Sequence, residues 1–147
     1  AYVQLARAVI ADTRGTQRRV ILDRGAAMAE ACGAAGWHQT RAGLDHDAAV
    51  QTAPGLLRLA SCHDAAGLVR ALAAGCDAAV LGSVQSTSTH PGALPMGWES
   101  FAALAGNTNL PVYAIGGVGP RDRATAFMHH AQGVAGISAY WSRSQGS

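Results

Sequence analysis

Short apolar runs alternate with amphipathic segments along most of the chain. The run Asp77–Gly82 is almost wholly apolar and has the length of a strand buried on both faces of a parallel sheet. Similar runs recur about every 20 residues, so the pattern predicts six strands, each followed by a helix except the last. The predicted strands are Arg19–Asp23, Gly36–Thr40, Leu56–Ser61, Asp77–Gly82, Val112–Ile115 and Val134–Ile137.

The segments between these runs have helical spacing and recognisable ends. Asp45 and Asp64 stand where a helix N-cap is expected, and Pro120 stands where a first helical turn tolerates proline. Gly33 and Gly75 follow helices as stop signals. The pattern therefore predicts helices over residues 1–11, 25–32, 45–51, 65–74, 98–105 and 120–130.

Repeated strand–helix units imply parallel strands joined by right-handed crossovers. Both a doubly wound sheet and a (β/α) barrel have such spacing. Two glycine-ended strands near the C-terminus, within Tyr113–Gly117 and Gly133–Ser138, favour the barrel, because barrels bind phosphate after their last two strands. We expect a TIM-type α/β barrel domain over residues 1–141, followed by a frayed tail over 142–147.

Composition narrows the class of protein. The chain has 147 residues, of which 49% are hydrophobic and 14% charged, and its formal charge of +2 is too weak to indicate nucleic acid as a partner. No apolar run reaches the roughly 18 residues of a membrane span. The three cysteines (Cys32, Cys62, Cys76) lie in apolar segments without a CxxC pair, which predicts buried thiols in a reducing cytoplasm.

The glycine-ended strands are the candidate site for an anion. Gly116 and Gly117 let backbone N–H groups approach a phosphate, and Ile137 and Ser138 offer further N–H groups with a hydroxyl. The helix after Pro120 would add its positive dipole end. The alternative is that the glycines only permit tight turns. Their occurrence on consecutive strands favours phosphate binding.

These strand ends belong to a wider set of motifs. The hydroxyl-rich loop Leu81–Gly97, the Leu22–Arg24 strand end and the Gly36–His38 and Ala60–His63 runs accompany Ile115–Gly117 and Val134–Ala139 in order. Together they resemble the thiamine phosphate synthase family and its thiazole tautomerase relatives, most of all the barrel domain fused behind a Nudix hydrolase in some bacteria. A synthase of this family joins a pyrimidine diphosphate to a thiazole phosphate with the help of Mg²⁺.

The resemblance implies roles for individual residues. Asp23 falls on a magnesium carboxylate, Ser61 on a serine at the pyrophosphate or pyrimidine side, and His90 on the position of a lysine, so these three are the candidate catalytic residues. Asp23 is also the candidate metal ligand, and Mg²⁺ the expected cofactor. The implied phosphate-binding residues are Thr87, Thr89, Gly116, Gly117, Ile137 and Ser138.

The sequence also departs from the family pattern. Leu22 replaces an asparagine, Ala42 and Gly43 stand where a second magnesium carboxylate is expected, and Ser83 replaces the tautomerase histidine. A single carboxylate holds Mg²⁺ poorly. Three functions therefore stay open: an enzyme that forms or processes thiazole phosphate, a non-catalytic module that senses a phosphate ester for an attached Nudix hydrolase, and a dimerisation domain with a relic pocket.

The same resemblance sets expectations about assembly. Barrels of this kind have eight strands, so we expect the first two to be absent from this sequence. Such a remnant has open sheet edges, which a homodimer could cover. The expected partners are a small phosphorylated heterocycle, a second copy of the chain and a covalent Nudix domain upstream, with neither nucleic acid nor membrane.

Overall fold

The computed structural model describes residues 1–46, 53–87, 92 and 94–140. Strands and helices alternate from β1 onwards. The strands are β1 (Ile21–Leu22), β2 (Gly36–Gln39), β3 (Leu57–Cys62), β4 (Ala78–Leu81), β5 (Val112–Ile115) and β6 (Gly133–Ala135). The helices are α1 (Tyr2–Asp12), α2 (Gly25–Cys32), α3 (Arg41–His46), α4 (Ala65–Ala73), α5 (Gly97–Ala105) and α6 (Arg123–Met128), with a 3₁₀ turn η1 (Pro120–Asp122) before α6.

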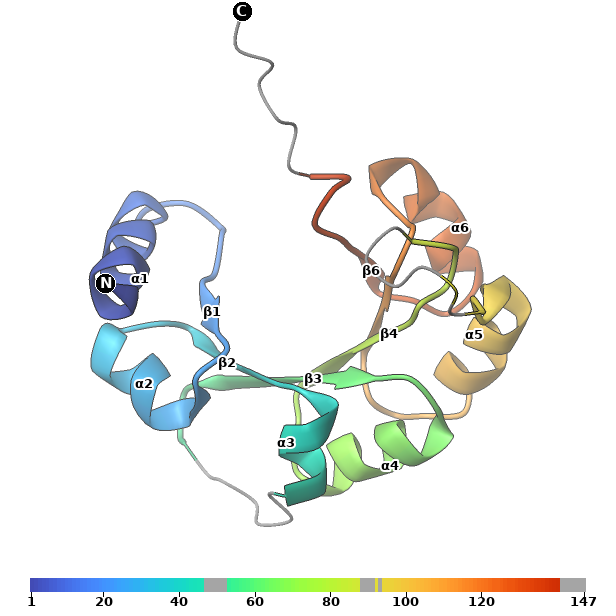
Figure 1. The fold of residues 1–147 in the computed structure, drawn as a ribbon, viewed down its shortest axis with the longest axis horizontal. Coiled ribbons are helices and arrows are strands. Elements are labelled where there is room, and N and C mark those ends of the chain that lie inside the picture. The colour runs from blue at the N-terminus through green and yellow to red at the C-terminus, as the bar shows by residue number, and fades with distance from the viewer. Residues whose placement is uncertain (47–52, 88–91, 93, 141–147) are drawn as a thin grey trace, which may run out of the picture.

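The strands form one parallel sheet in the order β1-β2-β3-β4-β5-β6. The sheet curves strongly and the helices lie outside the curve, so the described chain forms half of a TIM-type barrel (Figure 1). β1 and β6 are the two edges of this half-barrel. The expected α/β barrel fold is confirmed, and every carboxyl strand end lies on the same rim, where barrels place their chemistry.

Two apolar clusters hold the helices to the convex face of the sheet. The larger one joins β3, β4 and β5 to α4 and α5, with Leu81 and Phe101 completely buried. The smaller one joins α1, α2, β1 and β2 around Trp37. Burial alternates along β3, so Ala60 and Cys62 face the helices while Ser61 faces the inside of the curve. The concave face therefore carries the side chains that are available for function.

Two predicted helices differ from the structure. Asp45 was expected to cap a helix over 45–51, but α3 begins at Arg41, and Thr40 caps it by accepting a hydrogen bond from the Gly43 N–H (3.2 Å). Residues 47–52 lie outside the described part of the chain. The helix predicted over 120–130 begins as the η1 turn and ends at Met128. β6 also ends earlier than predicted, so Ile137 follows the strand.

Other predictions have simpler outcomes. All three cysteines are buried and unpaired, as expected. Within the described residues, no helix is long and apolar enough to cross a membrane. The frayed tail predicted for residues 142–147 lies outside the described part of the chain, and the domain boundary before it stays a prediction.

Candidate functional site

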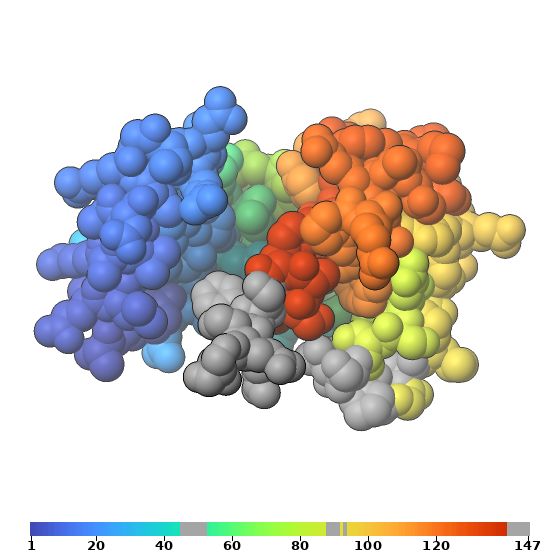
Figure 2. Space-filling view, turned by 90° about the horizontal axis from the view of Figure 1, so that it is seen from above, coloured from blue at the N-terminus to red at the C-terminus, as the bar shows by residue number. Residues whose placement is uncertain are grey.

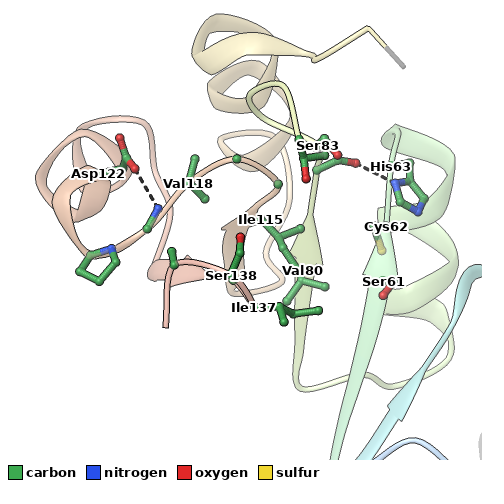
Figure 3. Close-up of a pocket in the computed structure, with 18 of the residues that line it drawn as sticks. Ser61, Cys62, His63, Val80, Ser83, Ile115, Val118, Asp122, Ile137 and Ser138 are labelled. Carbon is green, nitrogen blue, oxygen red and sulfur yellow. Dashed lines mark hydrogen bonds between the residues drawn. The ribbon is translucent and has the colours of Figure 1, made fainter. Parts of the chain in front are cut away.

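A cavity of about 810 Å³ opens on the concave side at the carboxyl ends of the strands. Seen from above, the molecule is hollowed between its N-terminal third (blue) and the α6 region (orange), with residues from the middle of the chain at the floor (Figure 2). β3, β4 and the segments after β5 and β6 supply most of the wall (Figure 3). This is the rim at which α/β barrels bind their ligands.

One end of the cavity, between the segments that follow β5 and β6, is built from backbone amides. Gly117, Ile137 and Ser138 line it, and their N–H groups donate no hydrogen bond within the described residues. The Ser138 hydroxyl and the half-buried Thr87 line the same cavity. Unpaired amides beside hydroxyls are donors suited to phosphate oxygens. We call Thr87, Gly117, Ile137 and Ser138 the amide end.

The two glycines after β5 have a packing role as well. Gly116 and Gly117 have φ values of +92° and +68°, which side chains rarely adopt. A Cβ on Gly117 would lie 2.5 Å from the Ser86 carbonyl oxygen, and one on Gly116 would lie 2.6 Å from the Ser83 Cα. Glycine is therefore required here because the 83–86 loop packs directly on the end of β5. From the sequence, the approach of a ligand and a tight turn were the two explanations for these glycines, and the contact with the 83–86 loop is a third.

The N–H group just before the 3₁₀ turn η1, where the helix dipole was expected to bind an anion, already has a partner within the protein. The Asp122 side chain accepts a hydrogen bond from the Gly119 N–H at 2.8 Å, and that amide is therefore not available to a ligand (Figure 3). α6 has only six residues and begins beyond the η1 turn. The positive dipole end predicted after Pro120 is therefore weaker than expected, and the free amides after β5 and β6 are the stronger anion donors.

The opposite wall is made by the ends of β2 and β3. The Ser61 hydroxyl lines the cavity and lies 2.7 Å from Nε2 of His38, which is half-buried on β2. His63 donates from Nδ1 to the Gly82 carbonyl at 2.7 Å, which ties the end of β3 to the end of β4.

Arg41 and Arg121 bring positive charge to the rim. Both line the cavity, and Arg41 pairs at 3.7 Å with Asp64, the residue that caps α4. Neither arginine was singled out from the sequence. Arg41 follows the end of β2 and Arg121 follows the end of β5 within a few residues. A sequence analysis could have identified them from this position at the carboxyl rim.

Asp23 has another partner within the described residues. Its Oδ1 accepts a hydrogen bond from the Tyr2 hydroxyl at 2.6 Å, and that bond lowers the pKa of the Asp23 carboxyl. It does not cap α2, whose first residues have no side-chain cap. Within the described residues, no three His, Cys, Asp or Glu side chains are grouped as a metal site. Among the described residues, the carboxylates therefore do not fit a resident Mg²⁺.

The structure brings most of the predicted site residues together. Ser61, Thr87, Gly116, Gly117, Ile137 and Ser138 all line the cavity. Asp23 is not among the described lining residues. Thr89 and His90 lie outside the described part of the chain.

Comparison with known proteins agrees with this architecture. The chain is 27% identical over 137 residues to the "Putative thiamine-phosphate synthase 2" of Aquifex aeolicus, covering 93% of the chain and 74% of that relative. It is 32% identical over 139 residues to the "Putative thiamine-phosphate synthase" of Geobacter sulfurreducens, covering 93% of the chain and 65% of that relative.

A solved structure has the same fold. Thiamine phosphate pyrophosphorylase from Pyrococcus furiosus superposes with a TM-score of 0.71 at 20% identity, over 92% of this chain and 64% of that one. The chain thus spans about two thirds of the length of these relatives. The family model described as thiamine monophosphate synthase matches residues 1–140. The chain therefore belongs to the thiamine monophosphate synthase family.

Proposed function

We propose that this domain binds a phosphorylated thiazole or thiamine phosphate, with the phosphate at the amide end of the cavity. The supporting observation is that Gly117, Ile137 and Ser138 line one cavity and that their N–H groups donate no hydrogen bond within the described residues. A phosphate seated there would accept from them and from the Ser138 hydroxyl. The names of the relatives, which refer to thiamine phosphate synthesis, suggest the heterocycle.

The condensation step is the finer part of the proposal. Joining a thiazole phosphate to a pyrimidine diphosphate releases pyrophosphate, which needs cationic help to depart. Arg41 and Arg121 are the cations that line the cavity among the described residues. Because Asp23 lies outside the lining and bonds to Tyr2, a second candidate function also has support: a phosphate-ester binding module without catalysis.

One experiment separates these functions. The chain is incubated with hydroxyethylthiazole phosphate, the pyrimidine diphosphate and Mg²⁺, and thiamine phosphate is assayed. In parallel, thermal melts are recorded with hydroxyethylthiazole phosphate, thiamine phosphate and unphosphorylated hydroxyethylthiazole. A ligand at a hundredfold excess over its Kd stabilises the native state by about 2.7 kcal/mol, which raises the Tm by several degrees.

The outcomes differ for each function. Product formation supports an enzyme. A rise in Tm with the phosphorylated ligands and no product supports the binding module. If the phosphorylated and unphosphorylated ligands give the same Tm, the proposal of a phosphate site is wrong. If none of these ligands changes the Tm and no product forms, only a dimerisation domain with a relic pocket is left of the three functions considered.

A further inference from the structure

The Asp23 carboxylate holds the first turn of α1. The Tyr2 hydroxyl donates to Asp23 Oδ1 at 2.6 Å, a short bond of the kind that a hydroxyl makes to a charged oxygen. The guanidinium of Arg24 lies over the Tyr2 ring, with its Cζ 4.7 Å from the ring centroid. Tyr2 is therefore held at its hydroxyl and at one ring face by two consecutive residues that follow β1.

α1 depends on polar contacts because little of its surface is packed. Of its 11 described residues, Ala6 alone is fully buried, and the helix has no side-chain cap at its N-terminus. The Arg7 side chain donates to the Ala31 carbonyl of α2 at 3.1 Å. The bond from Tyr2 to Asp23 adds a second attachment, which joins the N-terminal end of α1 to the carboxyl end of β1.

The cavity offers few carboxylates to a hard cation. Ala42 and Gly43 are the positions at which a second magnesium carboxylate was expected, and Ala42 lines the cavity with a methyl group. Among the described lining residues, Asp122 carries the one carboxylate, and its Oδ2 accepts a hydrogen bond from the Gly119 N–H at 2.8 Å. Mg²⁺ needs near-octahedral oxygen ligands, so the described lining and Asp23 do not make its site.

The protein itself brings positive charge to the cavity. Arg41 and Arg121 line it, and the amide end adds N–H groups that donate no hydrogen bond within the described residues. Backbone N–H groups and guanidinium groups are the donors that proteins use for phosphate oxygens. The charge of a phosphate group can therefore be met here without a metal ion.

We propose that Asp23 anchors α1 through Tyr2 instead of holding Mg²⁺, and that the cavity binds its phosphorylated ligand without a divalent cation. The first half of this inference stands on the contacts of Asp23 alone. The second half rests on the proposed function, because it concerns the ligand of that cavity. Separate measurements test the two halves.

Manganese binding tests the metal directly. Mn²⁺ takes the same oxygen ligands as Mg²⁺, and its electron paramagnetic resonance signal weakens when the ion is bound to a protein. We expect the signal of free Mn²⁺ to be the same with and without the chain. A weaker signal with the wild type that is restored with Asp23→Asn would assign a metal ion to Asp23 and overturn the inference.

Hydrogen exchange tests the anchor. Tyr2→Phe removes the donor and should speed amide exchange in α1 by about three- to tenfold, the net contribution of one hydrogen bond. Asp23→Leu should have the same effect alone and no further effect in the Tyr2→Phe background. Asp12→Asn changes an exposed aspartate at the other end of α1 and is the matched control. If Tyr2→Phe speeds exchange no more than Asp12→Asn does, Asp23 does not anchor the helix and the inference is wrong.

Ligand binding tests the cavity. The Kd of hydroxyethylthiazole phosphate is measured by calorimetry in EDTA and in Mg²⁺, and we expect the two values to agree within about twofold. A Kd about tenfold lower in Mg²⁺ would overturn the second half of the inference. If the ligand binds in neither solution, the proposed function fails and the second half fails with it, whereas manganese binding and hydrogen exchange still decide the role of Asp23.

Discussion

Replacing Gly117 by alanine should destabilise the fold through the loop that packs on β5. Gly117 has a φ of +68°, and a new Cβ would lie 2.5 Å from the Ser86 carbonyl oxygen and 2.8 Å from the Gln85 Cβ. Real Cβ atoms do not approach this closely, so the loop must move. The loop is attached to the end of β5 by two backbone bonds of 3.0 Å, from Val84 N–H to the Ile115 carbonyl and from Gln85 N–H to the Gly116 carbonyl.

The magnitude follows from two contributions. An alanine in the left-handed region costs about 1–2 kcal/mol, partly offset by about 0.4–1 kcal/mol of lost freedom in the unfolded chain. Breaking both loop bonds adds about 1 kcal/mol each. We therefore expect Gly117→Ala to lower the free energy of unfolding by about 3 kcal/mol.

The chain offers a matched control for the backbone contribution alone. Gly33, at the end of α2, has a φ of +73°, and a Cβ there would have no atom within 4 Å. Gly33→Ala should cost only about 1 kcal/mol. Urea unfolding of both variants, followed by far-UV circular dichroism, gives the difference directly. If Gly117→Ala is no more destabilising than Gly33→Ala, the loop does not pack on β5 as described.

Three further predictions test other parts of the molecule. Asp64→Ala removes the 2.7 Å cap on the Gly67 N–H and should lower the free energy of unfolding by about 1 kcal/mol in urea titrations, whereas Asp64→Asn should keep most of it. Burial raises the pKa of the Cys62 thiol to about 11, so iodoacetamide should label Cys62 in the native protein at pH 8 far more slowly than in urea; equal rates would contradict its burial. Tyr2→Phe removes the hydrogen bond that lowers the pKa of Asp23, so a carboxyl ¹³C titration should show this pKa rising toward its usual range. In the wild type, the bond adds stability at pH values above the ordinary Asp pKa. This stability is lost as the pH falls through the lowered pKa.

Much of the fold could be predicted because each strand appears in the sequence as a short apolar run. In β4 (Ala78–Leu81) every residue is apolar and all but Val80 are buried, which removes ambiguity about the type of this element. The glycines at the ends of the last two predicted strands indicated the rim of the sheet on which the cavity lies. The error at α3 arose because Gly43 within its first turn hides the helical pattern, while Thr40 gives the real cap.

The site was harder to predict than the fold, because its details depend on contacts between residues distant in sequence. Nothing in the local pattern shows that Tyr2 bonds to Asp23, or that Asp122 occupies the amide of Gly119. The contact of His38 with Ser61 crosses two strands. Five of the six residues predicted to bind phosphate line one cavity, and their role stays a prediction, whereas the sequence could not show that Asp23 is not among the described lining residues.

The most direct test of the proposed site is a titration of the ¹⁵N-labelled chain with hydroxyethylthiazole phosphate, followed by backbone amide chemical shifts. The unphosphorylated alcohol is the control. We predict that the amide signals of Gly117, Ile137 and Ser138 shift most, and only with the phosphorylated ligand, because these residues line the cavity and their N–H groups have no acceptor within the described residues. Shifts of equal size with the alcohol, or shifts confined to other parts of the chain, would contradict phosphate binding at the amide end.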